Sequence, residues 1–415
     1  MTVELISVGT ELLLGNIVNT NAAYLSRKLA SLGLSSYYQV TVGDNEERVI
    51  EAVNTAMSRA DIVILTGGLG PTEDDMTKEA VAKALGLNLI SDEHSRDCIM
   101  KYFEKLGVTE ITENNWKQAV VVEGSQVIDN LNGLAPGMII TRGEKKVILL
   151  PGPPNEMIPM FEDDIMDYLT GLQPNIIYST MVKIAGIGES KVETIIRDLV
   201  DQQSNPTIAT YAKTGEVHIR VTASAPTKAE AKGLVKPVVK EIKHRFKENV
   251  FTTNEKETLE DVVVKLLNKY DLTITTAESC TAGLLTGRLV NVSGVSDVLK
   301  EGFITYSNKA KRKYLDVNKS TLKKYTAVSE QVAKEMAKGA ALGTNADVSV
   351  AITGLAGPNG GSEEKPVGLV YIGCYVNEHV TVKKYNFAGD RQKVREYAVI
   401  SALDLLRRCI IENYK

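Results

Sequence analysis

Apolar positions up to residue 150 fall into short runs that alternate with segments of helical periodicity. The continuous runs predict buried strands, and the segments with apolar residues three and four apart predict amphipathic helices. Strands separated by helices of this length predict βαβ units and a parallel sheet. The expected strands are Val3–Val8, Ser36–Val42, Asp61–Leu65 and Lys146–Leu150, and the expected helices are Asn21–Leu32, Glu46–Arg59 and Thr77–Leu85.

The pattern changes beyond residue 170, where strands and helices form a smaller set. Strands at Tyr178–Ile184, Thr207–Tyr211 and Val217–Ala223 accompany helices at Glu189–Val200 and Lys228–Phe251. This combination predicts a small α+β unit of about 80 residues.

A third unit follows the polar stretch Thr252–Thr258. We therefore expect an α/β protein of two three-layer domains with parallel or mixed sheets, residues 1–170 and 253–415, joined by a small α+β domain at 171–252. The third unit's expected helices are Leu259–Lys269, Leu284–Val290, Glu330–Leu342 and Gln392–Arg408, and its strands are Leu272–Thr276, Val348–Thr353 and Gly368–Tyr375.

Composition narrows the class of protein. The chain has 415 residues, of which 43% are hydrophobic, so it can form real cores. Its 48 Lys and Arg against 52 Asp and Glu leave a net charge of −4, which argues against a dedicated nucleic-acid binder. No apolar run approaches the roughly 18 residues that span a bilayer, and the N-terminus lacks the basic start of a signal peptide. We expect a cytoplasmic protein with no membrane partner.

The four cysteines are scattered, without a CxxC pair, and we expect no His–Cys cluster among them. None of the four histidines lies in a glycine-rich or turn-like motif. This pattern favours a reducing compartment and predicts neither a disulfide scaffold, a zinc knuckle nor a histidine metal site.

The first candidate site follows the strand Asp61–Leu65. Thr66-Gly-Gly-Leu-Gly-Pro71 leads into Glu73-Asp-Asp75 and a helix. Glycine loops let backbone amides approach an anion, and a helix N-terminus adds partial positive charge. The carboxylates would repel a bare phosphate, and a divalent cation such as Mg²⁺ between the two would resolve that conflict. The alternative is a tight turn whose acidic residues cap a helix.

Three other segments could meet this loop: Gly9-Thr-Glu11, Asn132-Gly-Leu-Ala-Pro-Gly137 and Pro151-Gly-Pro-Pro-Asn-Glu156. The first and the last lie just beyond strand ends, where ligands bind in parallel α/β sheets. Glu11 and Glu156 are therefore further candidate acids.

The second candidate site lies in Ala277-Glu-Ser-Cys-Thr-Ala-Gly283, between a strand and a helix. Ser279 on such a turn can expose its hydroxyl close to backbone amides that stabilise an oxyanion. Lys311, five residues after Tyr306, can act as its base if burial keeps the amine neutral. The alternative makes Ser279 a helix cap and Lys311 part of a solvated helix face.

Two further segments of this unit suit an anion. Thr353-Gly-Leu-Ala-Gly-Pro358 follows a buried strand and could form a phosphate or oxyanion cradle. Arg391, in Gly389-Asp-Arg391, and Arg395 one turn later offer guanidinium donors for a phosphate. A surface loop and a helix cap at Asp390 are the alternatives.

The N-terminal motifs Ser7-Val-Gly-Thr-Glu-Leu-Leu-Leu-Gly15, Thr66–Thr77 and Leu150–Met157 resemble the molybdopterin-binding-like domain of the competence/damage-inducible protein A (CinA) family. The resemblance implies a metal-dependent ADP-ribose pyrophosphatase that yields AMP and ribose 5-phosphate. It implies a divalent metal, Mg²⁺ or similar, at Asp74 or Asp75 and Glu156. The expected substrate-binding residues are Gly67, Gly68, Gly70, Thr72 and Asn132.

The C-terminal motifs, with Tyr306-Ser-Asn308, resemble the C-terminal CinA domain, which also occurs alone as nicotinamide mononucleotide (NMN) deamidase. This implies hydrolysis of NMN to nicotinic acid mononucleotide and ammonia without a cofactor. It implies Ser279 as nucleophile, Lys311 as base and Tyr306 as an assisting residue. The substrate would contact Thr353, Gly354, Ala356 and Gly357, with Arg391 on its phosphate.

The middle unit resembles the KH-like domain of the same family. Gly186-Ile-Gly188 does not match the GXXG clamp of nucleic-acid-binding KH domains, so we expect this unit to join domains in a homodimer and not to bind RNA or DNA. Two alternative functions stay open: a non-enzymatic partner of the competence or recombination machinery, and a pterin-binding or adenylyl-transfer N-terminal module.

Overall fold

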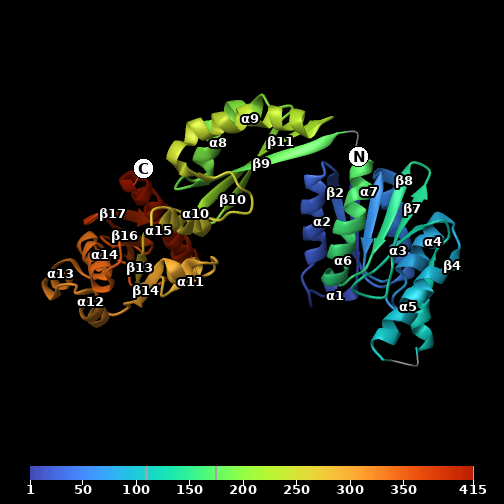
Figure 1. Ribbon diagram of the computed structural model, residues 1–415, viewed down its shortest axis with the longest axis horizontal. Coiled ribbons are helices and arrows are strands. Elements are labelled where there is room, and N and C mark those ends of the chain that lie inside the picture. The colour runs from blue at the N-terminus through green and yellow to red at the C-terminus, as the bar shows by residue number, and fades with distance from the viewer. Residues whose placement is uncertain (108–110, 173–174, 415) are drawn as a thin grey trace. The chain divides into compact units, whose positions relative to one another are not determined.

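The computed structural model describes residues 1–415 except 108–110, 173–174 and 415 (Figure 1). Its contacts divide the chain into two units, Met1–Tyr178 with Ser224–Ala231, and Ser179–Ala223 with Lys232–Lys415. Within the described residues, every helix is too short or too polar to cross a lipid bilayer.

The expected α/β pattern of the first unit forms a six-stranded mixed sheet. The strand order is β2-β1-β3-β8-β7-β6, in which the first four strands run parallel and the last two antiparallel. The chain moves from β1 to β2 in one direction and to β3 in the other, so the order reverses between β1 and β3. The strands are β1 (Thr2–Val8), β2 (Ser35–Val42), β3 (Ile62–Thr66), β6 (Gln126–Ile128), β7 (Gly137–Arg142) and β8 (Lys145–Leu150).

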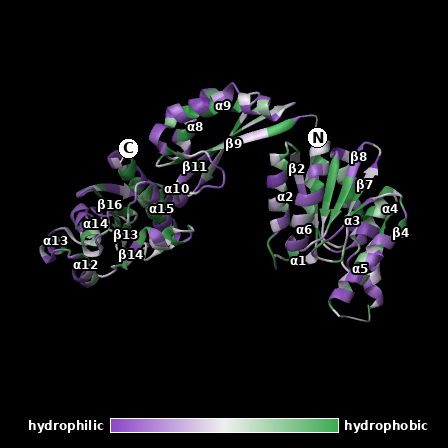
Figure 2. Ribbon diagram, viewed as in Figure 1, coloured by the Kyte–Doolittle hydropathy of each residue, from purple (hydrophilic) through white to green (hydrophobic). Residues whose placement is uncertain are grey.

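Helices cover both faces of this sheet, because its central strands carry apolar residues on both sides. In β3, Ile62 and Ile64 pack on one face, whereas Val63 and Leu65 pack on the other. Figure 2 shows these strands as largely hydrophobic and the flanking helices as partly hydrophilic. One face carries α2 (Thr20–Ser31), α6 (Pro154–Met160), a π-helical turn (Phe161–Ile165) and α7 (Met166–Gly171), and the other carries α3 (Glu46–Arg59) and α4 (Thr77–Leu85).

Smaller elements complete the first unit. A two-stranded sheet pairs β4 with β5, and α5 lies between them in sequence. The bounds are α1 (Thr10–Leu13), β4 (Leu89–Ser91), α5 (Glu93–Lys105), a 3₁₀ helix (Glu113–Ala119) and β5 (Val120–Val122).

The middle segment forms the small α+β fold that the sequence predicts, a four-stranded sheet of order β10-β11-β9-β12 with two long helices. The expected helix Lys228–Phe251 is wrong at its end: α9 stops at Phe246, and Lys247 has a φ of 45°, which a continuing helix does not allow. The elements are β9 (Ile176–Ala185), α8 (Glu189–Asp201), β10 (Thr207–Lys213), β11 (Glu216–Ala225), α9 (Lys228–Phe246), a 3₁₀ turn (Lys247–Asn249) and β12 (Val250–Thr252).

The C-terminal segment forms a second three-layer fold around a five-stranded sheet of order β14-β13-β15-β16-β17. The first three strands are parallel, and the order again reverses, here between β13 and β15. The strands are β13 (Ile274–Glu278), β14 (Leu299–Ile304), β15 (Val348–Gly354), β16 (Leu369–Val376) and β17 (His379–Asn386).

Helices again cover both faces of this second sheet. One core packs around α10, α11 and α15, and the other around α12, α13 and α14. The sequence analysis missed β14, β17, α12 and α13, and it placed β13 two residues early. The helices are α10 (Leu259–Lys269), α11 (Leu284–Val290), a 3₁₀ turn (Val295–Asp297), α12 (Asn308–Leu315), α13 (Lys319–Tyr325), α14 (Glu330–Thr344) and α15 (Arg391–Tyr414).

Candidate active sites

A cleft of about 690 Å³ opens in the first unit where the strand order reverses. Its walls come from the loops after β1, β3 and β8, together with the loop between β6 and β7. Ligands bind at this place in open α/β sheets because two neighbouring loops diverge there. The segments expected to meet therefore do meet: Gly9, Glu11, Gly67, Gly68, Gly70, Asp74, Asp75, Asn132 and Glu156 all line the cleft.

The loop after β3 requires glycine at its first two positions. Gly67 has a φ of 97°, and a Cβ there would lie 2.3 Å from the carbonyl oxygen of Val8. Gly68 has a φ of 68°, and a Cβ there would lie 2.1 Å from Oγ1 of Thr77. The backbone is thereby drawn tightly against β1 and the start of α4, which leaves the loop open to the cleft.

The cleft is acidic. Its walls carry carboxylates from Glu11, Asp44, Asp74, Asp75 and Glu156, and no lysine, arginine or histidine stands among the described residues that line it. The expected metal residues Asp74, Asp75 and Glu156 share the cleft but do not gather into one three-ligand cluster within the described part of the chain. Mg²⁺ requires no such cluster, because it usually takes one or two carboxylates plus phosphates and waters.

Hydrogen bonds hold two of these acids by one oxygen each, and the second oxygen of each accepts no hydrogen bond from the described residues. Oδ2 of Asp75 accepts from the amide and the hydroxyl of Thr72, at 3.0 and 2.5 Å. Oε2 of Glu156 accepts from Asn130 at 2.7 Å. Thr72 itself faces a neighbouring hollow, so it orients Asp75 instead of lining the cleft.

In the second unit, Ser279 follows β13 directly, on the side where the strand order reverses. Nζ of Lys311 lies 2.9 Å from Oγ of Ser279. Lys311 comes from α12, a helix that the sequence analysis raised only as part of its alternative, and its side chain is fully buried. The predicted pair is therefore brought together across 32 positions of sequence.

Burial lowers the pKa of Lys311 to about 8, and no carboxylate among the described residues pairs with its amine. The amine also donates to the carbonyl oxygens of Thr305 and Tyr306, at 2.7 and 3.4 Å. In the neutral form these two acceptors take its two protons. The lone pair then points at the Ser279 hydroxyl, which is the orientation that a general base needs.

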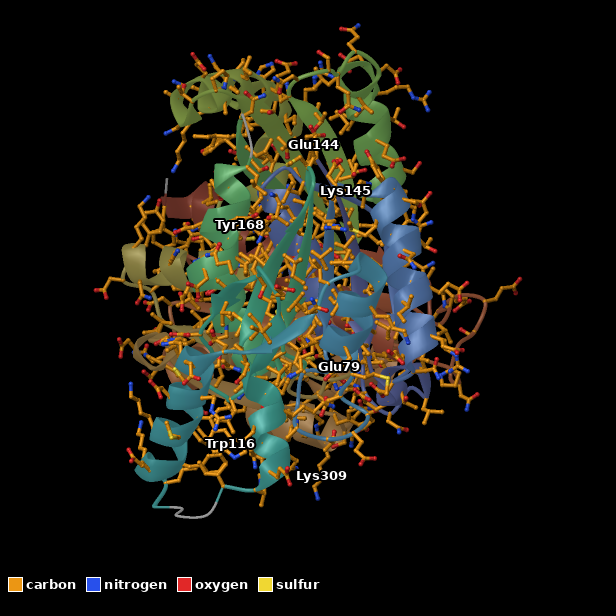
Figure 3. The ribbon with its side chains drawn as sticks, turned by 90° about the vertical axis from the view of Figure 1, so that its right-hand side faces the viewer. Glu79, Trp116, Glu144, Lys145, Tyr168 and Lys309 are labelled. Carbon is orange, nitrogen blue, oxygen red and sulfur yellow. The ribbon has the colours of Figure 1, made fainter. Side chains whose placement is uncertain are left out.

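The structural alternatives for these two residues are wrong. Gly283, and not Ser279, is the N-cap of α11. On α12, Lys309 does lie on a solvated face (Figure 3), but Lys311 points inward, to the sheet. The neighbouring Cys280 is no competing nucleophile, because burial raises the pKa of its thiol to about 11.

The remaining predicted residues differ in placement. The guanidinium of Arg391 donates to the carbonyl oxygen of Gly357 at 2.7 Å and to the hydroxyl of Tyr306 at 3.4 Å, beside a surface hollow of about 350 Å³. The Tyr306 hydroxyl therefore points to Arg391, and only its backbone carbonyl contacts Lys311.

The loop after β15 is packed inward over much of its length. Thr353 is buried, with its hydroxyl donating to the carbonyl of Ala327 at 2.8 Å, and Ala356 is buried as well. At Gly354 a Cβ would lie 2.7 Å from the side chain of Val370, so the sheet leaves no room for a larger residue.

Comparison with known proteins identifies the family of this chain. Three family models match successive parts of the chain: "Probable molybdopterin binding domain" over residues 4–171, "Damage-inducible protein CinA KH domain" over residues 179–252 and "CinA C-terminal domain" over residues 256–410. A CinA-like protein of Kosmotoga olearia is 51% identical over 99% of this chain and 99% of its own length. A CinA-like protein of Dictyoglomus thermophilum is 50% identical over 99% of this chain and 100% of its own. The chain belongs to the CinA family.

Solved CinA structures match single parts of the chain. A crystal structure of the protein CinA, of unknown function, from Thermoplasma acidophilum is 37% identical and covers 40% of this chain and 98% of its own, with a TM-score of 0.38. A CinA-superfamily structure from Escherichia coli is 38% identical and covers 39% of this chain and 97% of its own, with a TM-score of 0.36.

This CinA-family chain positions its serine with two residues whose roles sequence reasoning missed. Glu278 is fully buried, and its carboxylate accepts from the amides of Gly283, Leu285 and Thr286 at 2.9 to 3.1 Å. Arg395, expected at a phosphate, instead donates to the carbonyl oxygens of Cys280 and Thr281, at 3.0 and 2.9 Å. The signal available for Glu278 was its position in the motif, directly before Ser279.

The acidic loop of the first unit is likewise held by two lysines that the sequence analysis did not single out. Lys117 donates to the carbonyl oxygens of Thr72 and Asp75, at 2.8 and 2.5 Å. Lys78 is buried, which lowers the pKa of its amine to about 8, and it donates to the carbonyl of Lys117. Neither lysine lines the cleft: Lys117 holds the loop directly, and Lys78 holds Lys117.

One sequence-based expectation is contradicted outright. A His–Cys cluster does exist, because His94 and Cys98 stand one helical turn apart on α5 and meet Asp129. The four-residue spacing, which puts two side chains on one helix face, was the signal for the first two.

Proposed function

We propose that the second unit is an amidohydrolase that converts NMN to nicotinic acid mononucleotide and ammonia. The observation that carries this proposal is the 2.9 Å distance between Oγ of Ser279 and Nζ of Lys311. The lysine is fully buried, and burial lowers the pKa of its amine. We choose NMN as the substrate because the motifs resemble the C-terminal CinA domain. The Ser–Lys pair supports acyl transfer as the reaction.

In the first half-reaction, Oγ of Ser279 bonds to the carboxamide carbon while the Lys311 amine takes the hydroxyl proton. The negative charge moves to the amide oxygen. The amides of Cys280 and Thr281 are available donors for it, since they donate to no oxygen of the described residues, whereas the amide of Ser279 is engaged with Ile352 at 3.0 Å. Collapse breaks the C–N bond, and the Lys311 ammonium gives its proton to the departing amide nitrogen, which leaves as ammonia.

In the second half-reaction, water attacks the Ser279 ester, and the neutral Lys311 amine takes the water proton. Cleavage of the ester C–O bond gives the carboxylate and returns the proton to Ser279. Arg391 would contact the 5′-phosphate of the nucleotide, because its guanidinium lines a surface hollow.

We propose a second activity for the first unit, metal-dependent hydrolysis of ADP-ribose to AMP and ribose 5-phosphate. The acidic cleft supports it, because a diphosphate cannot approach five carboxylates without a cation to neutralise charge. Oδ1 of Asp75 and Oε1 of Glu156 would hold the cation, which would screen the diphosphate and polarise its phosphorus–oxygen bonds. The amides of the glycine loop would orient the phosphates.

The two proposals control for each other in one experiment. Ser279→Ala should abolish ammonia release from NMN and leave AMP release from ADP-ribose unchanged. The double variant Asp75→Asn with Glu156→Gln should do the reverse, and a chelator should inhibit only AMP release. If Ser279→Ala still releases ammonia, the serine mechanism is wrong. If chelator leaves AMP release intact, the metal proposal is wrong.

The same variants decide the alternatives. A non-enzymatic competence partner requires DNA uptake that survives both sets of substitutions. A pterin-binding or adenylyl-transfer module requires turnover of molybdopterin with ATP in place of ADP-ribose.

A further inference from the structure

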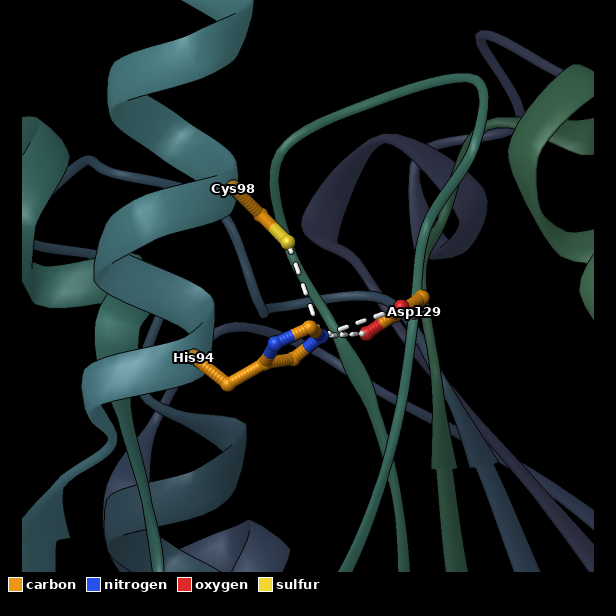
Figure 4. Close-up of side chains that lie close together, drawn as sticks. All are labelled: His94, Cys98 and Asp129. Atoms are coloured by element: carbon orange, nitrogen blue, oxygen red, sulfur yellow. Dashed lines mark hydrogen bonds and ion pairs between the residues drawn. The ribbon is translucent and has the colours of Figure 1, made fainter.

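Three side chains of different chemistry meet on the surface of the first unit, outside the residues proposed for ADP-ribose cleavage. His94 and Cys98 project from one face of α5, and Asp129 follows β6 (Figure 4). Nε2 of His94 lies 2.9 and 3.1 Å from the two carboxylate oxygens of Asp129 and 3.6 Å from Sγ of Cys98. The three ligand atoms lie within 4.8 Å of one another.

We propose that His94, Cys98 and Asp129 form a binding site for a thiophilic divalent metal of the Zn²⁺ type. Imidazole nitrogen, thiolate and carboxylate oxygen are the three donor types that Zn²⁺ takes in proteins. A tetrahedral Zn²⁺ with these bond lengths would separate nitrogen from sulfur by about 3.5 Å and nitrogen from oxygen by about 3.3 Å. The first separation is present, and the second requires a shift of a few tenths of an ångström by exposed side chains.

A thiol and a carboxylate stand together in this cluster. A divalent cation between the two would stabilise the thiolate and the carboxylate together. Cys98 is also the one exposed cysteine among the described residues, so its thiol is open to a metal.

A small cavity of about 100 Å³ adjoins the cluster and is lined by Ser95, Cys98 and Asp129. It has room for water as the fourth ligand. Ser95 is 5% exposed, and its hydroxyl has no hydrogen-bond partner within the described residues. A polar atom left in this state on the wall of a cavity is expected to face water or another ligand.

The site also touches the wall of the acidic cleft. Asp129 precedes Asn130, whose amide donates to Glu156 at 2.7 Å and to the carbonyl of Ala135 at 2.9 Å. The metal would therefore connect α5 to the segment that carries Asn130, the hydrogen-bond partner of Glu156, and Asn132. We assign it a bracing role, separate from any metal that acts on a phosphate.

The test uses the full chain, freed of metal with a chelator and titrated with Co²⁺ as a spectroscopic probe, then with Zn²⁺ in competition. We expect one equivalent of Co²⁺ to give sulfur-to-metal charge-transfer absorption that Zn²⁺ abolishes. Cys98→Ser should remove the absorption, and His94→Ala should weaken binding at least tenfold. Asp97→Asn, an exposed acid on the same helix outside the cluster, is the matched control and should bind as the wild type does. The affinity for Co²⁺ should rise about tenfold per pH unit over the range in which the free thiol is protonated, because binding releases that proton.

The proposal is overturned if Co²⁺ binds without thiolate absorption, or if Cys98→Ser binds it unchanged. Asp75→Asn with Glu156→Gln should leave the absorption intact, so failure here is distinct from failure of the proposed pyrophosphatase. Cys98→Ser and the double variant Asp75→Asn with Glu156→Gln change only exposed or half-buried residues, and circular dichroism would verify that both proteins fold.

Discussion

Replacing Lys311 with methionine would separate the chemistry of the buried amine from its part in folding. Methionine has a similar length and no charge, so it can occupy the same space beneath Ser279. If the neutral amine is the general base, Lys311→Met should lower kcat/KM for ammonia release about 10²- to 10⁴-fold.

The pH profile of the wild type follows from the pKa of Lys311, which burial lowers from 10.5 to about 8. At pH 7 about one tenth of the amine is neutral, and at pH 9 about nine tenths is. The kcat/KM for NMN should therefore rise about tenfold between pH 7 and pH 9. Lys311→Met should lose this dependence along with the activity.

Stability should respond differently. Since the folded pKa lies below the unfolded one, the unfolded chain binds more protons between pH 8 and 10.5, and the free energy of unfolding rises with pH over that window. Below it the buried ammonium costs ~3 kcal/mol, which methionine would relieve. The variant also loses three hydrogen bonds, each contributing about 1 kcal/mol. The two effects nearly cancel, so Lys311→Met should unfold at almost the wild-type urea concentration.

The assay is initial-rate ammonia release from pH 6.5 to 9.5, with urea denaturation of each protein at pH 7. Lys309→Met, an exposed lysine on the same helix, is the matched control and should keep wild-type rates and the same pH profile. A flat wild-type profile over this range, or a folded Lys311→Met with activity within tenfold of the wild type, would refute the assignment of Lys311 as base.

Three further predictions concern hydrogen bonding, helix packing and substrate binding in the second unit. Glu278→Ala leaves one buried and two partly buried amides without their acceptor, so we expect a loss of about 3 kcal/mol in stability, measured as a lower Tm, together with a lower kcat; an unchanged Tm would contradict this. Gly339→Ala on α14 would place its Cβ 1.9 Å from the carbonyl oxygen of Leu315, so it should lower the Tm, whereas Gly343→Ala on the same helix meets no atom within 4 Å and should stabilise by about 0.5–1 kcal/mol. Arg391→Met should raise KM for NMN about tenfold or more with little change in kcat, because a phosphate contact far from the reacting bond contributes equally in the ground and transition states; equal loss in kcat would place Arg391 at the reacting atoms instead.

Local sequence was sufficient for the central strands and the main covering helices of each sheet, but it did not predict β4 to β7 or α5 to α7 of the first unit. Mostly apolar runs marked β1, β3, β8 and β15, because strands buried on both faces carry apolar residues on both sides. It failed at β14, whose sequence Leu-Lys-Glu-Gly-Phe-Ile is mixed in character, and whose pairing with β13 depends on a neighbour 25 residues away. It failed at the end of α9 as well, where the polar residues after Phe246 look helical until Lys247 turns the backbone.

The candidate sites divide in the same way. The sequence alone determined which loops are candidates for chemistry, because glycines, acids and a serine directly after buried strands are typical of ligand-binding and catalytic loops. Only the tertiary structure decided that Lys311 is buried against Ser279, that Arg395 holds the serine loop and that His94, Cys98 and Asp129 meet. Periodicity reports which face of an element a residue occupies, whereas the charge state of an amine and the partners of a ligand depend on what other elements pack against that face.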